Sequence, residues 1–236
     1  MIFNKVKFPM ILRRVIRNSS ILYPLYVKYI LRNDTVVFPD ASTELHLTGF
    51  PRSANTYCYN ILKVVFPSLI IRSHIHTTAS IKLALKHRVP TLVLVRDPVA
   101  TCCSLLLKHH LEPSPNKVES LLKDYIEYHG FVLSNKGRFK ILKFQDVVGS
   151  PEFIVRSVCE YLKFSMSSAE TKAKAQDGQR LVEAKEGQKA IEGSSLPNET
   201  RKKMKRGVEG HVVSHPLCSH ANALYESIII EDYKIG

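Results

Sequence analysis

An apolar run, Leu45–Phe50, leads directly into a short segment dense in hydrogen-bond donors. Arg52, Ser53, Asn55 and Thr56 follow it within a few positions, and the residues beyond them have helical spacing. At such a strand-to-helix turn, several backbone N–H groups converge on one point, and the helix N-terminus adds partial positive charge. Hydroxyls supply further donors. The segment therefore predicts an anion site, in particular one for a phosphate group.

A second pair of residues suited to an anion follows the apolar run Thr91–Val95. Arg96 comes directly after that run, and Ser104 lies on the helix expected near Ala100–His109. A guanidinium can grip a phosphate through two parallel N–H groups, and a hydroxyl adds a donor. An Arg-Asp-Pro tripeptide alone is equally consistent with a helix cap and an ordinary ion pair. Its order after a phosphate loop is what indicates a second phosphate site.

A histidine lies between these two segments along the chain. His74 follows an expected strand at Leu69–Ser73, which would deliver it to the same sheet edge. Imidazole titrates near neutral pH and can take the proton of an attacking hydroxyl. We take His74 as the candidate base, with His76 as the alternative. Both could instead be polar strand-end and cap residues, and two histidines without further ligands make a poor zinc site.

The segment GFPRSANTY, residues 49–57, resembles the 5′-phosphosulfate loop of sulfotransferases that use 3′-phosphoadenosine 5′-phosphosulfate (PAPS), commonly P-[KR]-S-G-[TN]-T-W. The matching positions are Pro51, Arg52, Ser53, Asn55 and Thr56. Two positions depart from the pattern: Ala54 replaces a glycine, and Tyr57 replaces the tryptophan that lies against adenine in the family. A nucleotide-triphosphatase loop would require Gly-Lys-Ser/Thr where this chain has Ala-Asn-Thr.

Three further segments resemble motifs of the same family. Arg96-Asp97-Pro98, with Ser104 eight positions after the arginine, is similar to its 3′-phosphate motif. The segment around His74 resembles the K-T-H segment of members that act on hydroxyls. The looser match is Lys205-Arg206-Gly207, which resembles the R-K-G-x-x-G segment that closes over the 3′-phosphate, with its basic residues transposed.

The resemblance implies an enzyme that moves a sulfuryl group from PAPS to an acceptor hydroxyl and releases 3′-phosphoadenosine 5′-phosphate (PAP), without a metal. Its catalytic residues would be Arg52, which stabilises charge on the leaving oxygen, and His74. The acceptor could be a sugar, a lipid, a small alcohol or a peptide tyrosine, and nucleic acid is not expected as a partner. The implied nucleotide-binding residues are Arg52, Ser53, Ala54, Asn55, Thr56, Tyr57, Arg96, Ser104, Lys205, Arg206 and Gly207.

These residues need a scaffold that brings strand ends together. Short β-rich runs alternate with helical segments from Glu44 onward, which is the signature of βαβ units and a parallel sheet. We therefore predict a three-layer α/β/α domain, which by resemblance is a P-loop-like sulfotransferase fold. The expected strands are Leu45–Phe50, Leu69–Ser73, Thr91–Val95 and Phe139–Phe144; the expected helices are Asn55–Val65, Thr77–His87, Ala100–His109, Val118–Ser134, Pro151–Leu162 and Pro216–Ile229.

The chain divides into an N-terminal arm, 1–40, and a single α/β domain, 41–236, in which residues 165–200 have few large apolar side chains and are expected to be mobile. Residues 1–33 contain seven Lys and Arg and no acidic residue. We expect a helical arm whose apolar face packs on the domain; a membrane-surface anchor for an anionic membrane is the alternative. Five scattered cysteines fit a reducing compartment, so we expect a cytoplasmic protein, peripheral to a membrane if the arm binds one.

The net charge of +13 favours an anionic partner without identifying it. Three other functions stay open. A P-loop kinase or NTPase would explain the strand-to-helix turn but lacks its lysine motif. A non-catalytic nucleic-acid-binding module would explain the basic run 201–206 but lacks a regular pattern of aromatic and basic residues. A sulfotransferase relative that binds nucleotide without turnover would explain Ala54 and the altered C-terminal motif.

Overall fold

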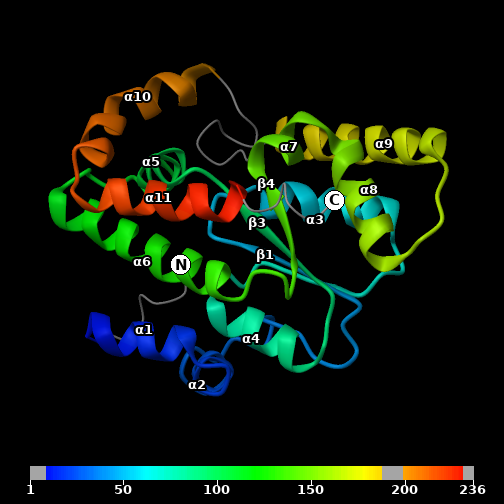
Figure 1. Ribbon diagram of the computed structural model, residues 1–236, viewed down its shortest axis with the longest axis horizontal. Helices are drawn as coiled ribbons and strands as arrows, with labels where there is room; N and C mark the ends of the chain where they lie inside the picture. The colour runs from blue at the N-terminus through cyan, green and yellow to red at the C-terminus, as the bar shows by residue number, and fades with distance from the viewer. Residues whose placement is uncertain (1–8, 188–198, 231–236) are drawn as a thin grey trace.

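The structure is a computed structural model that describes residues 9–187 and 199–230, and its centre is a four-stranded parallel sheet (Figure 1). The strands run in the order β2-β1-β3-β4, and every neighbouring pair is parallel. This confirms the predicted α/β class. The bounds of the strands are β1 (Leu45–Gly49), β2 (Ile71–Arg72), β3 (Thr91–Val95) and β4 (Lys140–Lys143).

Helices cover both faces of the sheet, which completes the predicted three layers (Figure 1). Strand β2 is shorter than its apolar run predicts. The sequence did not predict helix α7 or the positions at which the helices of the N-terminal arm begin and end. The helices are α1 (Met10–Asn18), α2 (Leu22–Leu25), the π-helix η2 (Tyr26–Ile30), α3 (Asn55–Val65), α4 (Thr78–Lys86), α5 (Pro98–Lys108), α6 (Pro115–Ser134), α7 (Phe144–Gly149), α8 (Pro151–Leu162), α9 (Ser168–Gly187), α10 (Glu199–Val213) and α11 (Leu217–Ile230).

Strand β3 contributes side chains to two hydrophobic cores, one on each face of the sheet. Successive side chains on a strand point to opposite faces. Leu92 and Leu94 accordingly pack in a core formed with α3, α8 and α9, whereas Val93 and Val95 pack in the other core with α5, α6 and α11. All four are fully buried. A strand covered on both faces reads as a continuous apolar run, which is why TLVLV predicted a central strand.

Proline and a side-chain cap fix the start of two helices. Pro98 opens α5, and the Asp97 carboxylate accepts a hydrogen bond from the Ala100 N–H at 2.7 Å. Pro151 opens α8 in the same way, with Ser150 accepting from Phe153. Proline lacks an N–H that the first helical turn could not use, and the cap satisfies one of the remaining donors. The expected first-turn position of Pro151 is confirmed.

Helix α9 is an ordered element within the stretch 165–200. Its buried positions are small residues, Thr171, Ala175, Gly178 and Val182, which lie on one face of the helix. Gly178 comes so near to Ile61 on α3 that an added Cβ would stand 3.3 Å from that side chain. Helix α9 therefore packs through the close approach of its backbone to α3, and not through large apolar side chains. The mobility predicted for this stretch stays a prediction, and residues 188–198 lie outside the described part.

Helix α1 of the arm contacts the domain through charged residues as well as apolar ones. Ile11, Leu12 and Val15 of α1 are exposed, whereas Arg14 and Arg17 turn toward α6 and pair with Asp124 at 3.3 Å. Ile16 of the same helix is buried in a core with Ile75 and Ala79, so α1 packs on the domain through an apolar residue as well as through its basic residues. Within residues 9–187 and 199–230, no helix is both long and apolar enough to span a bilayer.

Two histidines are completely buried in the domain. The Nδ1 atoms of His46 and His129 lie 3.2 Å and 2.9 Å from the carbonyl oxygens of Arg72 and Tyr125, respectively. A carbonyl can only accept, so Nδ1 carries a proton in both rings. Burial lowers the pKa of each imidazole to about 4, because the charged form would lose its hydration.

These histidines predict loss of stability in mild acid. Below pH 6.5 the unfolded imidazole binds a proton, whereas the folded imidazole does not until about pH 4. The free energy of unfolding should therefore fall as the pH falls through this window, by about 1.4 kcal/mol per pH unit for each histidine. Urea unfolding at pH 7, 6 and 5 measures the slope.

The substitution His129→Gln should reduce that slope by the contribution of one histidine. The same substitution at the exposed His87 is the matched control and should leave the slope unchanged. Equal slopes in wild type and His129→Gln would contradict the assignment.

Candidate functional site

The sheet order brings three predicted segments to one edge. Strand β1 lies between β2 and β3, and all three point the same way. The loop after β1 carries Arg52, the segment after β2 carries His74, and Arg96 directly follows β3. In open α/β sheets, ligands bind outside the carboxyl ends of the strands. The candidate base, the phosphate loop and the second arginine thus stand in neighbouring positions along this edge.

The loop between β1 and α3 has a tightly turned backbone. Arg52 and Ala54 both have positive φ angles, 73° and 69°. The Asn55 amide donates to the Phe50 carbonyl at 3.2 Å and contacts the Gly49 carbonyl at 3.4 Å, which ties the start of α3 to the end of β1. Ser53 is fully buried, and its hydroxyl has no hydrogen-bond partner among the described residues.

The two predicted anion sites are joined by direct contacts. The Nε of Arg52 donates to the Ser104 hydroxyl at 3.0 Å, and a terminal nitrogen of Arg96 donates to the Arg52 carbonyl at 2.6 Å. Ser104 lies on the first turns of α5 and is buried, as is Arg96. Two guanidinium groups and a hydroxyl from separate elements therefore surround one small region, where an anion would find several donors.

Two aromatic residues that the sequence did not single out hold Arg96 in place. The Tyr125 hydroxyl donates to the Arg96 carbonyl at 2.7 Å. The Arg96 guanidinium lies over the Phe144 ring, 3.9 Å from its centroid, in a cation–π arrangement. Tyr125 comes from α6 and Phe144 from the start of α7. No local motif marks them, because their role depends on elements that are distant in the chain.

The structure separates the roles of His74 and His76. The Nε2 of His74 is 3.5 Å from the Thr56 hydroxyl at the start of α3, and its ring packs edge-on against Tyr59. The Nδ1 of His76 instead lies 2.8 Å from the Gly49 carbonyl, and burial lowers the pKa of His76 to about 4. The His76 ring is therefore hydrogen-bonded to the backbone of β1. His74 is exposed beside the phosphate loop and is the better candidate base.

Tyr57 does not present a ring face at the surface. It is 8% exposed and belongs to the core formed with α3, α8 and α9. Burial raises the pKa of its phenol to about 12, with smaller contributions from Cys58 and Glu183. The predicted stacking on adenine stays a prediction, and it would have to use the edge of a ring that is largely packed.

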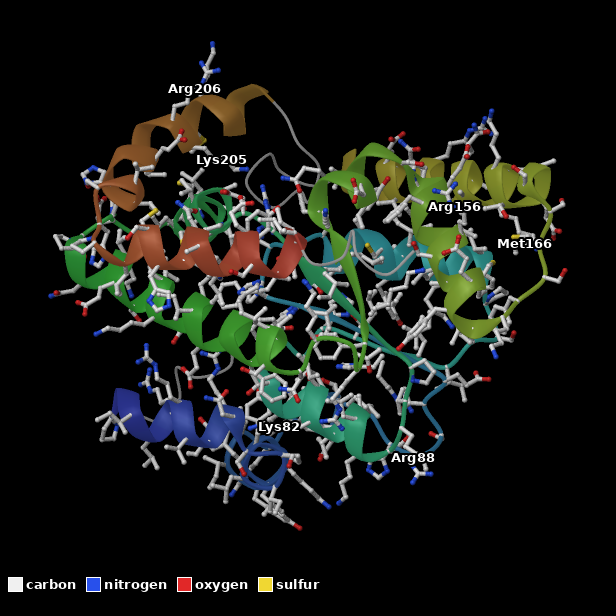
Figure 2. All side chains as sticks on the ribbon, viewed as in Figure 1. Lys82, Arg88, Arg156, Met166, Lys205 and Arg206 are labelled. Atoms are coloured by element: carbon white, nitrogen blue, oxygen red, sulfur yellow. The ribbon has the colours of Figure 1, made fainter. Side chains whose placement is uncertain are left out.

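The C-terminal residues predicted to close over the 3′-phosphate do not all face the same way. Lys205, Arg206 and Gly207 all lie within α10, which packs on α5. Lys205 is half-buried and close enough to Cys103 of α5 to lower the pKa of that thiol, whose main shift, to about 11, is upward and comes from burial. Figure 2 shows Lys205 on the α5 side of the helix and Arg206 pointing away into solvent. Only Lys205 is therefore near the Ser104 helix.

The cysteines and acidic residues add no further reactive centre in the described part of the chain. All five cysteines are buried with free thiols, among them Cys102 and Cys103 on α5. Over residues 9–187 and 199–230, no group of three or more His, Cys, Asp or Glu side chains is arranged to hold a metal ion.

The architecture defines a sulfotransferase-like α/β fold. Among solved structures, the chain is similar to the mouse sulfotransferase SULT7A1 in complex with PAP, with a TM-score of 0.51 and 11% sequence identity. The match covers 80% of this chain and 89% of that one. At this identity the likeness establishes the fold. No family model and no curated protein matches the chain.

The positive φ of Ala54 yields a prediction about stability. An L-residue in the left-handed region costs about 1–2 kcal/mol, which glycine avoids, although glycine also gains freedom in the unfolded chain. Ala54→Gly should therefore raise the free energy of unfolding by up to about 1 kcal/mol, measured by urea denaturation. Ala223→Gly, at an exposed helical position of α11, is the matched control and should lower it by about 1 kcal/mol. A loss of stability in Ala54→Gly would contradict this account of the loop.

Proposed function

We propose that the chain is a PAPS-dependent sulfotransferase that transfers the sulfuryl group to an acceptor hydroxyl and releases PAP. The observation that carries this proposal is the meeting of Arg52, Ser104 and Arg96 at the carboxyl edge of the sheet, joined by contacts of 3.0 and 2.6 Å. A nucleotide with phosphates at both its 3′ and 5′ positions requires two neighbouring anion sites. The sulfotransferase-like fold supports the same interpretation.

The residues present suit such a nucleotide. The Ser53 hydroxyl is buried within the phosphate loop and has no partner among the described residues, although buried polar groups are normally hydrogen-bonded. A phosphate oxygen in the loop would satisfy it after a small opening of the site. The N-terminus of α3, an 11-residue helix, adds N–H groups and partial positive charge at the same point.

Each residue then has a defined task in the proposed reaction. Arg52 and the loop amides would hold the 5′ end, and Arg52 would stabilise the negative charge that develops on the departing phosphate oxygen. Arg96 and Ser104 would hold the 3′-phosphate. Bound PAPS supplies the activated sulfuryl group. His74 would take the proton from the acceptor hydroxyl, and Thr56 beside it would orient the imidazole.

Binding of PAP tests the nucleotide site directly. Isothermal titration should show PAP binding by the wild-type chain, weakened about tenfold to a hundredfold in Arg52→Ala and in Arg96→Lys, because each removes charge-assisted hydrogen bonds to a phosphate. Arg156→Ala, on the exposed side of α8, is the matched control and should bind like wild type (Figure 2). Absence of PAP binding by the wild-type chain would overturn the proposal.

The pH dependence of transfer tests the base. The His74 side chain is exposed, but the surrounding protein partly desolvates its ring and lowers its pKa, so activity should fall only as the pH drops through that lowered pKa. The assay uses labelled PAPS with a panel of sugar, lipid and phenolic hydroxyl acceptors. His74→Ala should lose about a hundredfold or more in rate and lose the acid limb of the profile.

His220→Ala, at an exposed position of α11, is the control and should keep both the rate and the acid limb. Unchanged turnover in His74→Ala would remove the base assignment while leaving the nucleotide site intact. A chain that binds PAP but transfers sulfuryl to no acceptor would instead support the non-catalytic alternative.

A further inference from the structure

Helix α1 leaves several of its apolar residues exposed. Ile11 is 79% exposed and Val15 is 52% exposed, and neither contributes to a core of the domain. In an ordinary amphipathic helix of a globular protein the apolar stripe faces the core and the charged face meets water. Here the apolar residues of α1 are divided, because Ile16 is buried in a small core with Ala79 of α4, whereas Ile11 and Val15 are exposed.

The polar face of α1 makes specific contacts with the domain. Arg14 and Arg17 both reach Asp124 of α6 at 3.3 Å, and Arg14 also lies 3.5 Å from Glu127. The Asn18 amide donates to Glu127, and the Thr78 hydroxyl of α4 donates to Asn18. These contacts hold α1 against the domain through its charged residues. With Ile16 buried and the basic residues paired, Ile11, Leu12 and Val15 are left exposed.

The segments after α1 extend the same surface. Ile21 is 71% exposed, and Leu25, Tyr29 and Ile30 are also exposed, whereas the buried residues of α2 and η2 form a small core with Ile75, Ile16 of α1 and Ala79 of α4. Figure 1 shows α1 and α2 together along one side of the molecule, with α9 and α10 on the opposite side. We call these exposed apolar residues, Ile11, Val15, Ile21, Leu25, Tyr29 and Ile30, the arm surface.

Exposed cations border the arm surface. Lys28 and Arg32 come from η2 and the residues that follow it, and Arg88 lies just beyond α4, which packs against α1. Figure 2 shows Arg88 on the same side of the molecule as α1 and α2. Residues 1–33 hold no acidic side chain. Large exposed apolar patches mark interaction sites, and apolar residues bordered by Lys and Arg match the interface of an anionic bilayer.

We propose that the arm surface binds peripherally to an anionic membrane, with its aliphatic side chains in the headgroup boundary and its cations against lipid phosphates. Self-association through the same surface is disfavoured, because it would bring together the cationic borders of two chains that each carry a net charge of +13. The proposal does not depend on sulfuryl transfer, since none of the residues that carry it belongs to the nucleotide site.

Co-sedimentation with vesicles tests the proposal on the full chain. We expect binding to vesicles of equal parts phosphatidylcholine and phosphatidylserine, and much weaker binding to phosphatidylcholine alone or at high salt, because each cation near the surface strengthens binding about fivefold. The triple variant Ile11→Asn, Val15→Asn, Ile21→Asn should lose about tenfold or more in binding to the mixed vesicles. The double variant Lys28→Gln, Arg32→Asn should lose a similar factor.

Matched controls keep the test specific. Leu181→Asn with Val213→Asn removes exposed apolar residues from α9 and α10, and Lys172→Gln with Lys203→Gln removes two exposed charges. Both control variants should bind mixed vesicles nearly as well as wild type. All the substituted side chains are at exposed positions, and far-ultraviolet circular dichroism and urea unfolding verify that each variant is folded.

Three results would overturn the proposal. The first is no binding of the wild type to mixed vesicles. The second is equal loss of binding in the control variants, which would make the attraction a general effect of net charge. The third is a dimer, seen by analytical ultracentrifugation, that the triple variant dissociates, because a second copy would then be the occupant of the arm surface.

Discussion

The site depends on the parallel pairing of β1 between β2 and β3. Gly49 makes this pairing close: a Cβ at that position would stand 2.6 Å from the Leu94 carbonyl oxygen and 2.8 Å from the Leu94 Cβ. The Gly49 carbonyl also receives His76 and contacts the Asn55 amide. One residue at the end of β1 thus fixes the neighbouring strand, the start of α3 and the segment that carries the candidate base.

The contacts around Arg52 and Arg96 concentrate positive charge in a partly buried place. Arg96 is 8% exposed, rests on Phe144, and donates to the backbone of the loop that carries the second guanidinium. Like charges in such surroundings repel more strongly than in water. An anion bound between them would offset that repulsion and satisfy the Ser53 hydroxyl. Affinity for the proposed nucleotide and stability of the edge are therefore coupled, since a ligand that binds only the folded chain stabilises it.

The sequence predicted the strands, most of the helices and the three segments that meet at the edge, because these follow from local apolar runs and capping residues such as Asp97. It could not predict Tyr125 and Phe144 behind Arg96, since those contacts join elements far apart in the chain. The sequence did not predict that α9 packs on the domain, because its packing depends on close approach at Gly178 and not on large apolar side chains. The orientation of Arg206 could not be predicted either, because a motif cannot tell which side of a helix a residue will face.

Helix α1 shows why an amphipathic pattern alone does not decide how a helix docks, because both Ile16 and the basic residues contact the domain. The pattern of α1 does not show these contacts, since the acidic pair Asp124 and Glu127 lies on a distant helix. The same contacts reach the base segment, since Asn18 accepts from Thr78 a few residues after His74. A membrane that holds the arm would therefore also hold the strand end that carries His74. The proposed reaction and the proposed membrane surface are thus connected through the contacts between α1 and α4.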